Sequence, residues 1–173
     1  DAGDQGGQLL YRDGIEHHRS GLRTQMSGIA APAGNPGGDP TGGCLCGAIR
    51  YRIDAAPVEA LYCHCRMCRR AHGAPVVAWL TISAADFVVT AGTLRAYPSS
   101  AQAVRHFCGI CGTPLTWRAA ANPQFVDVSI ASLDAPDMVA PGLHIWVESR
   151  IAWFETADHL PRYPTNQRPR PGF

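Results

Sequence analysis

The sequence has no lysine, and all 15 of its basic residues are arginines. Charged residues make up only 17% of the 173 residues, and the formal net charge is +1. Nucleic-acid binding relies on concentrated positive charge, so the lack of a broad basic field argues against a nucleic-acid partner. No acidic tail is present either, which excludes a solvating arm of that kind.

Long hydrophobic runs are also missing. The uninterrupted apolar stretches fall far short of the roughly 18 residues that a membrane span needs. Residues 1–25 are interrupted by charged side chains and have no apolar core segment, so we expect no secretory signal and a cytoplasmic location. In that reducing compartment, the seven cysteines indicate metal binding or catalysis rather than disulfides.

The composition divides the chain into an ordered middle and two flexible ends. Residues 1–41 are rich in Gly, Pro and Ala and predict a flexible extension. Within it, residues 1–25 are either an ordinary tail or a non-native addition before Met26. Residues 164–173 predict a second flexible tail. One domain is therefore expected over residues 42–163.

Short apolar stretches punctuated by Pro, Gly and Asp favour strands in this domain. Strands are expected over 48–53, 76–82, 104–107, 114–118 and 125–130, with a hairpin over 87–90 and 94–97 and a late pair over 144–147 and 151–154. Long segments with a helical period are missing, and one short helix is expected after Cys65, through Arg70. The pattern predicts a mainly β fold with little helix.

The cysteines fall into three tightly spaced groups within about 70 residues. Pairs of cysteines in turns supply two ligands at a time to tetrahedral zinc, and glycines beside the first and third groups allow tight turns around an ion. Three such groups are a strong indication of zinc. The groups are Cys44-Leu45-Cys46, Cys63-His64-Cys65-Arg66-Met67-Cys68 and Cys108-Gly109-Ile110-Cys111.

The count of cysteines indicates two different sites. Two closed all-cysteine sites need eight thiolates, whereas the chain has seven. The first and third groups can form a closed, structural site. That leaves Cys63, Cys65 and Cys68 for a site with an open position, which is the catalytic type.

Two alternatives stay open at this point. A histidine could complete the second site, with His72, His106 and His144 as possible donors; His64 is disfavoured, since neighbours in an extended stretch point to opposite faces. Alternatively, the CxxC of the third group could be a redox dithiol, although no βαβ pattern surrounds it.

Four stretches in order resemble the glutathione-dependent formaldehyde-activating enzyme family, whose domain the centromere protein V family shares. They are GGCLCGAIRY, CHCRMCRRAHGA, HFCGICGTPL, and HIWVESRIAWF with DHLPRY. The resemblance runs from about Gly42 to Tyr163 and implies an Mss4-like zinc-containing fold of small antiparallel sheets. It also implies two zinc ions per chain: a structural one on Cys44, Cys46, Cys108 and Cys111, and a catalytic one on Cys63, Cys65 and Cys68.

The resemblance implies a carbon–sulfur lyase that joins a small-molecule thiol such as glutathione to formaldehyde, or catalyses the reverse. Metal at an open thiolate site suits this chemistry, since it lowers the pKa of an incoming thiol. The alternative function is a zinc-stabilised interaction module without catalysis, which has no need of an open position.

Several side chains near the cysteines are candidates for binding substrate. Glutathione carries two carboxylates, and arginines could pair with them; Arg66 and Arg69 are the best placed, ahead of Arg70 and Arg105. His64 could move a proton or simply bond a neighbouring backbone group. Bulky aromatic residues are expected in the core rather than in a substrate platform. They are Trp79, Trp117, Trp146, Trp153 and Phe154.

Overall fold

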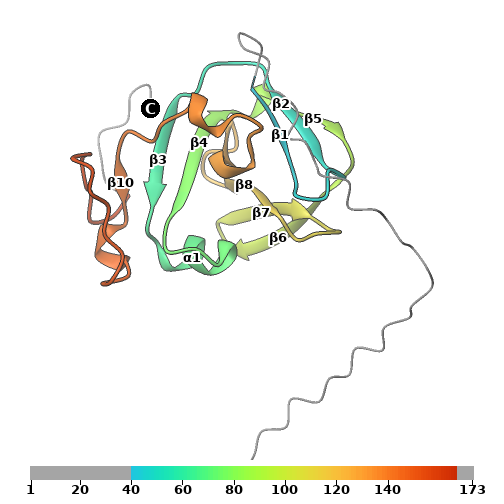
Figure 1. Cartoon of the computed structure of the whole chain (residues 1–173). Helices are drawn as coiled ribbons and strands as arrows, with labels where there is room; N and C mark the ends of the chain where they lie inside the picture. The colour runs from blue at the N-terminus through green and yellow to red at the C-terminus, as the bar shows by residue number, and fades with distance from the viewer. Residues whose placement is uncertain (1–39, 167–173) are drawn as a thin grey trace, which may run out of the picture. The chain divides into compact units, whose positions relative to one another are not determined.

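The computed structural model describes residues 40–166 (Figure 1), so most of the expected extension and tail, residues 1–39 and 167–173, lies outside the described residues. The strands are β1 (Thr41–Gly43), β2 (Arg50–Ile53), β3 (Glu59–Cys63), β4 (Val77–Ser83), β5 (Phe87–Ala91), β6 (Leu94–Ser100), β7 (Ala103–Cys108), β8 (Pro114–Ala119), β9 (Phe125–Ser129) and β10 (His144–Ile145). The helices are α1 (Arg66–His72) and the 3₁₀ turns η1 (Ala84–Asp86), η2 (Ile130–Ser132), η3 (Pro136–Met138) and η4 (Val147–Ser149).

The strands form two sheets. The smaller has the order β1-β2-β5, and the larger has seven strands in the order β10-β3-β4-β9-β8-β7-β6. Neighbouring strands run antiparallel except β10, which pairs parallel to β3. The expected mainly β fold with little helix is confirmed, since α1 is the only α-helix among the described residues.

Two strands were missed and two predicted pairs are wrong. The expected hairpin over 87–90 and 94–97 does not form, because β5 pairs with β2 in the smaller sheet whereas β6 pairs with β7 in the larger one. The sequence indicated neither β1, a Gly-rich strand of three residues, nor β3, which leads directly into the second cysteine group. In the predicted late pair, the first strand stops after Ile145, because Trp146 adopts a left-handed backbone with φ 59°. Residues 151–154 form no strand.

The segment after η4 returns along β10 instead. The His144 amide donates to the Pro161 carbonyl at 2.8 Å, and the Tyr163 amide donates to the His144 carbonyl at 2.9 Å. The Trp146 amide reaches the carbonyl of Thr165 at 3.4 Å. This edge strand is therefore held on one side by β3 and on the other by the end of the described chain.

The helix α1 owes its position to its two caps. Cys65 is the N-cap residue, and its sulfur accepts a hydrogen bond from the Cys68 amide at 3.2 Å. At the other end Gly73 has φ 61°, and its amide donates to the Arg69 carbonyl. The helix lies at one end of β3 and β4 (Figure 1), and Cys68 belongs to the same buried cluster as Cys63 and Val77.

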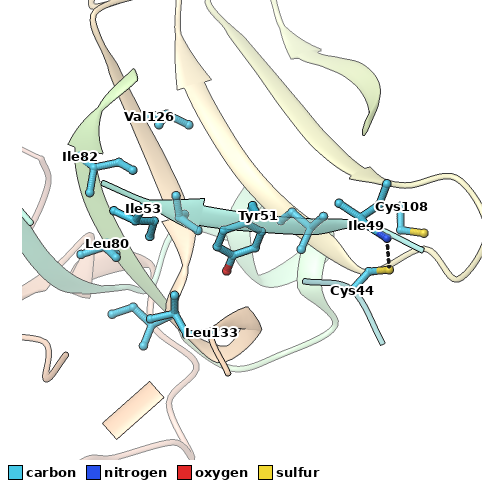
Figure 2. Packing of buried hydrophobic residues seen from close by; sticks show 12 residues of the cluster. Cys44, Ile49, Tyr51, Ile53, Leu80, Ile82, Cys108, Val126 and Leu133 are labelled. Carbon is cyan, nitrogen blue, oxygen red and sulfur yellow. Dashed lines mark hydrogen bonds between the residues drawn. The ribbon is translucent and has the colours of Figure 1, made fainter. Parts of the chain in front are cut away.

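The main hydrophobic core lies between strands of both sheets (Figure 2). Tyr51 and Ile53 of β2 pack there with Leu80 and Ile82 of β4, and all four are essentially excluded from water. Burying each such side chain contributes roughly 1.5–3 kcal/mol. Cys44 and Cys108 belong to the same cluster, so one cysteine group sits at the edge of this core.

Candidate metal centres and active site

The first and third cysteine groups meet at one four-thiol cluster. Its ligand atoms, from Cys44, Cys46, Cys108 and Cys111, all lie within 4.8 Å of one another. The sulfurs of Cys44 and Cys46 are 3.5 Å apart, and those of Cys46 and Cys108 are 3.8 Å apart. A tetrahedron with zinc–sulfur bonds of about 2.3 Å has edges of about 3.8 Å, so this donor set fits zinc.

Backbone groups support these sulfurs. The Ile49 amide donates to the Cys44 sulfur at 3.2 Å, and the Ile110 amide donates to the Cys108 sulfur at 3.4 Å. The Thr113 hydroxyl and amide lower the pKa of the Cys111 thiol. Such contacts favour the thiolate form, which is the form that binds metal.

The second group forms a separate three-thiol cluster at the junction of β3 and α1. Its three sulfurs, from Cys63, Cys65 and Cys68, lie within 4.8 Å of one another. Over residues 40–166 no histidine or carboxylate joins them as a fourth donor. Two of the histidines considered as donors have other partners: His106 Nδ1 lies 2.9 Å from the Thr116 hydroxyl, and His144 Nδ1 lies 2.8 Å from His64 Nε2.

The thiols of the three-thiol cluster differ in the direction of their pKa shifts. Hydrogen bonds from the Cys63 and Cys68 thiols lower the pKa of Cys65, with the Arg105 charge adding to the effect. The same thiol contacts and burial raise the pKa of Cys63. Arg105 is only 8% exposed, and its Nη2 lies 3.4 Å from the Cys68 sulfur. A buried permanent cation therefore accompanies the clustered thiols.

A cavity of about 430 Å³ opens beside the three-thiol cluster, and all three cysteines line it. Its walls include Trp79, Trp117 and Trp146, which the sequence assigned to the core. For Trp153 the core prediction is wrong, since this residue is 76% exposed. The left-handed backbone of Trp146 costs about 1–2 kcal/mol for a residue with a side chain. Strain of this kind is often retained at functional sites.

Of the predicted substrate-binding residues, some line the cavity and others do not. Arg66 lines the cavity, as does Arg105. Arg69 lies outside the lining and donates to the carbonyls of His64 at 3.2 Å and Ser149 at 2.8 Å. His64 is 2% exposed and is also not part of the wall. The substrate-binding roles of Arg66, Arg69 and His64 stay predictions.

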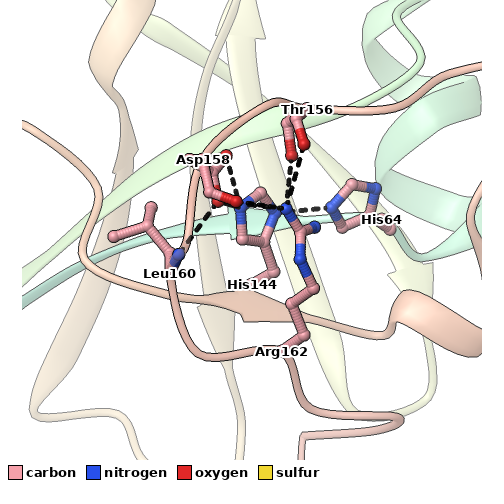
Figure 3. A network of polar contacts seen from close by, with 6 residues as sticks. All are labelled: His64, His144, Thr156, Asp158, Leu160 and Arg162. Atoms are coloured by element: carbon pink, nitrogen blue, oxygen red, sulfur yellow. Dashed lines mark hydrogen bonds and ion pairs between the residues drawn. The ribbon is translucent and has the colours of Figure 1, made fainter.

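His64 belongs to a polar network that the sequence reasoning missed (Figure 3). His144 bridges His64 to Asp158, whose carboxylate lies 3.1 Å from His144 Nε2. Asp158 also accepts from Arg162 at 3.0 Å and from the Leu160 amide at 3.1 Å. Burial, followed by nearby positive charges, lowers the pKa of His64 to about 4, so the ring is neutral at pH 7. In the sequence, Asp158 and Arg162 were indicated only as members of the DHLPRY stretch.

Together, the sheets and the two cysteine clusters define a mainly β domain with two places for a soft metal ion, one of them open to a cavity. The chain belongs to the family described as glutathione-dependent formaldehyde-activating enzyme, whose model matches residues 39–149.

The individual relatives have low sequence identity to this chain. A curated Halomonas elongata protein named "Putative glutathione-dependent formaldehyde-activating enzyme" is 27% identical over 124 residues, covering 66% of this chain and 78% of its own. The crystal structure of a Rhodobacter sphaeroides protein is 26% identical, with a TM-score of 0.47, and the match covers 58% of this chain and 96% of that one.

None of the helices over residues 40–166 is long and apolar enough to cross a membrane.

Proposed function

We propose that this protein is a zinc-dependent carbon–sulfur lyase that adds a thiol such as glutathione to formaldehyde or a similar small aldehyde, or catalyses the reverse. The observation that carries the proposal is the three-thiol cluster, which has no fourth donor over residues 40–166 and opens to a cavity. A structural zinc takes four protein ligands, whereas a catalytic one keeps a position free.

We infer zinc for both clusters because thiolate sets select soft or borderline metals. Cys44, Cys46, Cys108 and Cys111 would hold the structural ion, and Cys63, Cys65 and Cys68 the catalytic one. When bound at the second cluster, zinc would lower the pKa of a substrate thiol, so that the thiol is ionised at neutral pH. All seven cysteines are free, which fits a reducing compartment, and we place the reaction in the cytoplasm.

Arg105 is the protein group best placed to act during bond formation. As the thiol sulfur joins the carbonyl carbon, the carbonyl oxygen gains negative charge and then takes a proton, while the thiol has given one up. No electrons are exchanged with an outside partner. Arg105 lines the cavity and keeps its charge throughout, so it stabilises the developing oxyanion in a site of low dielectric.

Two measurements on the zinc-reconstituted protein test this proposal. The first is the number of zinc ions per chain, expected to be two in the wild type and one in Cys68→Ser. The second is the exchange rate between formaldehyde and S-(hydroxymethyl)glutathione, followed by magnetisation-transfer NMR because the reaction also proceeds spontaneously. Wild type should accelerate exchange, and Cys68→Ser should fall to the rate without protein.

The matched control is Trp153→Ala, which changes an exposed residue outside the cavity lining and should keep both zinc ions and the exchange rate. Two bound zinc ions without faster exchange, either for glutathione or for a second thiol such as 2-phenylethanethiol, would overturn the lyase and leave the zinc-stabilised interaction module. One zinc ion in both wild type and Cys68→Ser would overturn the open site itself.

A further inference from the structure

The cavity beside the three-thiol cluster is built on one cross-strand row of the larger sheet. Glu59 of β3 pairs with Thr81 of β4, which pairs with Asp127 of β9. Asp127 pairs with Trp117 of β8, which pairs with Arg105 of β7. Residues directly opposite each other on neighbouring strands point to the same face. All five line the cavity, so the sheet itself fixes the positions of its walls.

Aromatic rings dominate the apolar part of this wall. Trp79 lies two residues before Thr81 on β4 and so shares its face, and Phe125 lies two residues before Asp127 on β9. Trp146 completes the set from the turn after β10. Its backbone is left-handed, which no other non-glycine residue over 40–166 shares. The chain therefore keeps an unfavourable backbone conformation where an indole faces the ligand space.

The formal charge of the cavity disfavours an anionic ligand. Its two arginines, Arg66 and Arg105, are balanced by Glu59 and Asp127. Three thiolates around a divalent ion leave one net negative charge. Arg105 already contacts this charge, because its guanidinium donates to the Cys68 sulfur. Glutathione has two carboxylates and one ammonium group, so its body would add a further negative charge. Like charges in a partly enclosed site repel strongly.

We propose that the thiol this cavity selects has an uncharged aromatic body, rather than the charged tripeptide body of glutathione. The inference rests on the proposed function, because it takes the substrate sulfur to occupy the open position at the three-thiol cluster. The cavity volume of about 430 Å³ matches sites for molecules of drug-like size. Formaldehyde has only two heavy atoms, so most of the space is left to the group attached to sulfur.

Binding to the zinc-loaded full chain tests the proposal without relying on turnover. The probes are 2-phenylethanol, which has the aromatic body but no thiol, 2-phenylethanethiol and glutathione, each titrated by calorimetry. We expect 2-phenylethanol to bind, 2-phenylethanethiol to bind more tightly, and glutathione to bind at least about tenfold more weakly than the aromatic thiol.

Two variants probe the wall itself. Trp117→Ala should weaken 2-phenylethanol binding about tenfold, since an aromatic pair adds to the burial of the ring. Ala119→Trp keeps the existing rings but fills part of the cavity and should abolish binding. Trp153→Ala is the matched control and should bind like wild type, because this indole is 76% exposed and outside the lining. Thermal unfolding checks that each variant is folded.

The outcomes separate this inference from the function on which it rests. If 2-phenylethanol fails to bind, or binds equally to wild type, Trp117→Ala and Ala119→Trp, the aromatic selectivity is wrong, even where glutathione and formaldehyde are exchanged. If the aromatic probes bind as expected but no thiol is joined to formaldehyde, the lyase proposal is wrong and the aromatic binding site remains. Tighter binding of glutathione than of 2-phenylethanethiol would also overturn the inference.

Discussion

Arg105 is a buried cation whose hydrogen-bond partner is a sulfur atom. Its Nη2 lies 3.4 Å from the Cys68 sulfur, and its Nη1 is buried without a hydrogen-bond partner among the described residues. A buried charge is costly unless a neighbouring charge compensates it. The arrangement is therefore favourable when the three cysteines are ionised, which is the state that binds metal.

Replacing Arg105 with Gln should weaken zinc binding at the three-thiol cluster by about 10- to 100-fold, the usual effect of losing a group that supports metal ligands. The four-thiol cluster should keep its affinity. Competition with a chromophoric chelator resolves the two sites as two phases of zinc release. Arg70→Gln is the matched control, since Arg70 is exposed and does not line the cavity. Equal zinc release from Arg105→Gln and Arg70→Gln would contradict this role for Arg105.

At the scale of one element, α1 shows how a short helix can carry a site. It has only seven residues, too few to be stable alone, and depends on its caps and on packing. Its N-cap is Cys65, and its only buried residue is Cys68. The helix and the three-thiol cluster therefore depend on each other, and the C-terminal cap at Gly73 contributes to both.

The substitution Gly73→Ala should lower the free energy of unfolding by about 1 kcal/mol, because a residue with a Cβ disfavours the left-handed backbone at this position. A Cβ at Gly73 would meet no atom within 4 Å, so the loss comes from backbone conformation alone. Urea unfolding at neutral pH measures it. Gly142→Ala is the control, since Gly142 has no positive φ and its Cβ would make only an ordinary contact at 3.9 Å. Equal losses in the two variants would contradict the cap.

Over the whole described molecule, the four-thiol cluster joins the two sheets. Cys44 and Cys46 follow β1 of the smaller sheet. Cys108 ends β7 of the larger sheet, and Cys111 lies in the turn between β7 and β8. The main core lies beside this junction and includes Cys44 and Cys108. Metal at this cluster would cross-link segments more than 60 residues apart in sequence, as between Cys46 and Cys108. Because metal binding of this kind is coupled to folding, its loss should destabilise the entire domain.

We therefore expect Cys111→Ser to lower the melting temperature of the zinc-loaded protein by at least about 10 °C, since losing a few kcal/mol shifts a domain of this size that far. Cys68→Ser should lower it less, because the three-thiol cluster lies within the larger sheet and α1. Cys111 is suitable for this test because it is only partly buried, so little packing is lost. Differential scanning calorimetry with and without a chelator makes the comparison. A larger drop for Cys68→Ser would reverse the assigned roles.

Features that depend on neighbours along the chain were predictable from the amino-acid sequence. Cysteine spacing predicted which thiols act together, and alternating apolar residues predicted strands such as those near 76–82 and 125–130. The short helix after Cys65 also followed from local pattern. These predictions succeed because capping, alternation and ligand spacing act over a few residues.

The surroundings of the three-thiol cluster are visible only in the folded domain. Arg105 lies 37 residues from Cys68 in sequence, and no local signal ranks it above Arg69. The indoles of Trp79 and Trp117 line a cavity because strand register places them on the same face as Cys63, whereas Trp153 is left in solvent. The pairing of His64 with His144 spans 80 residues. Register and long-range pairing arise from packing of the whole sheet, so residue spacing alone does not determine them.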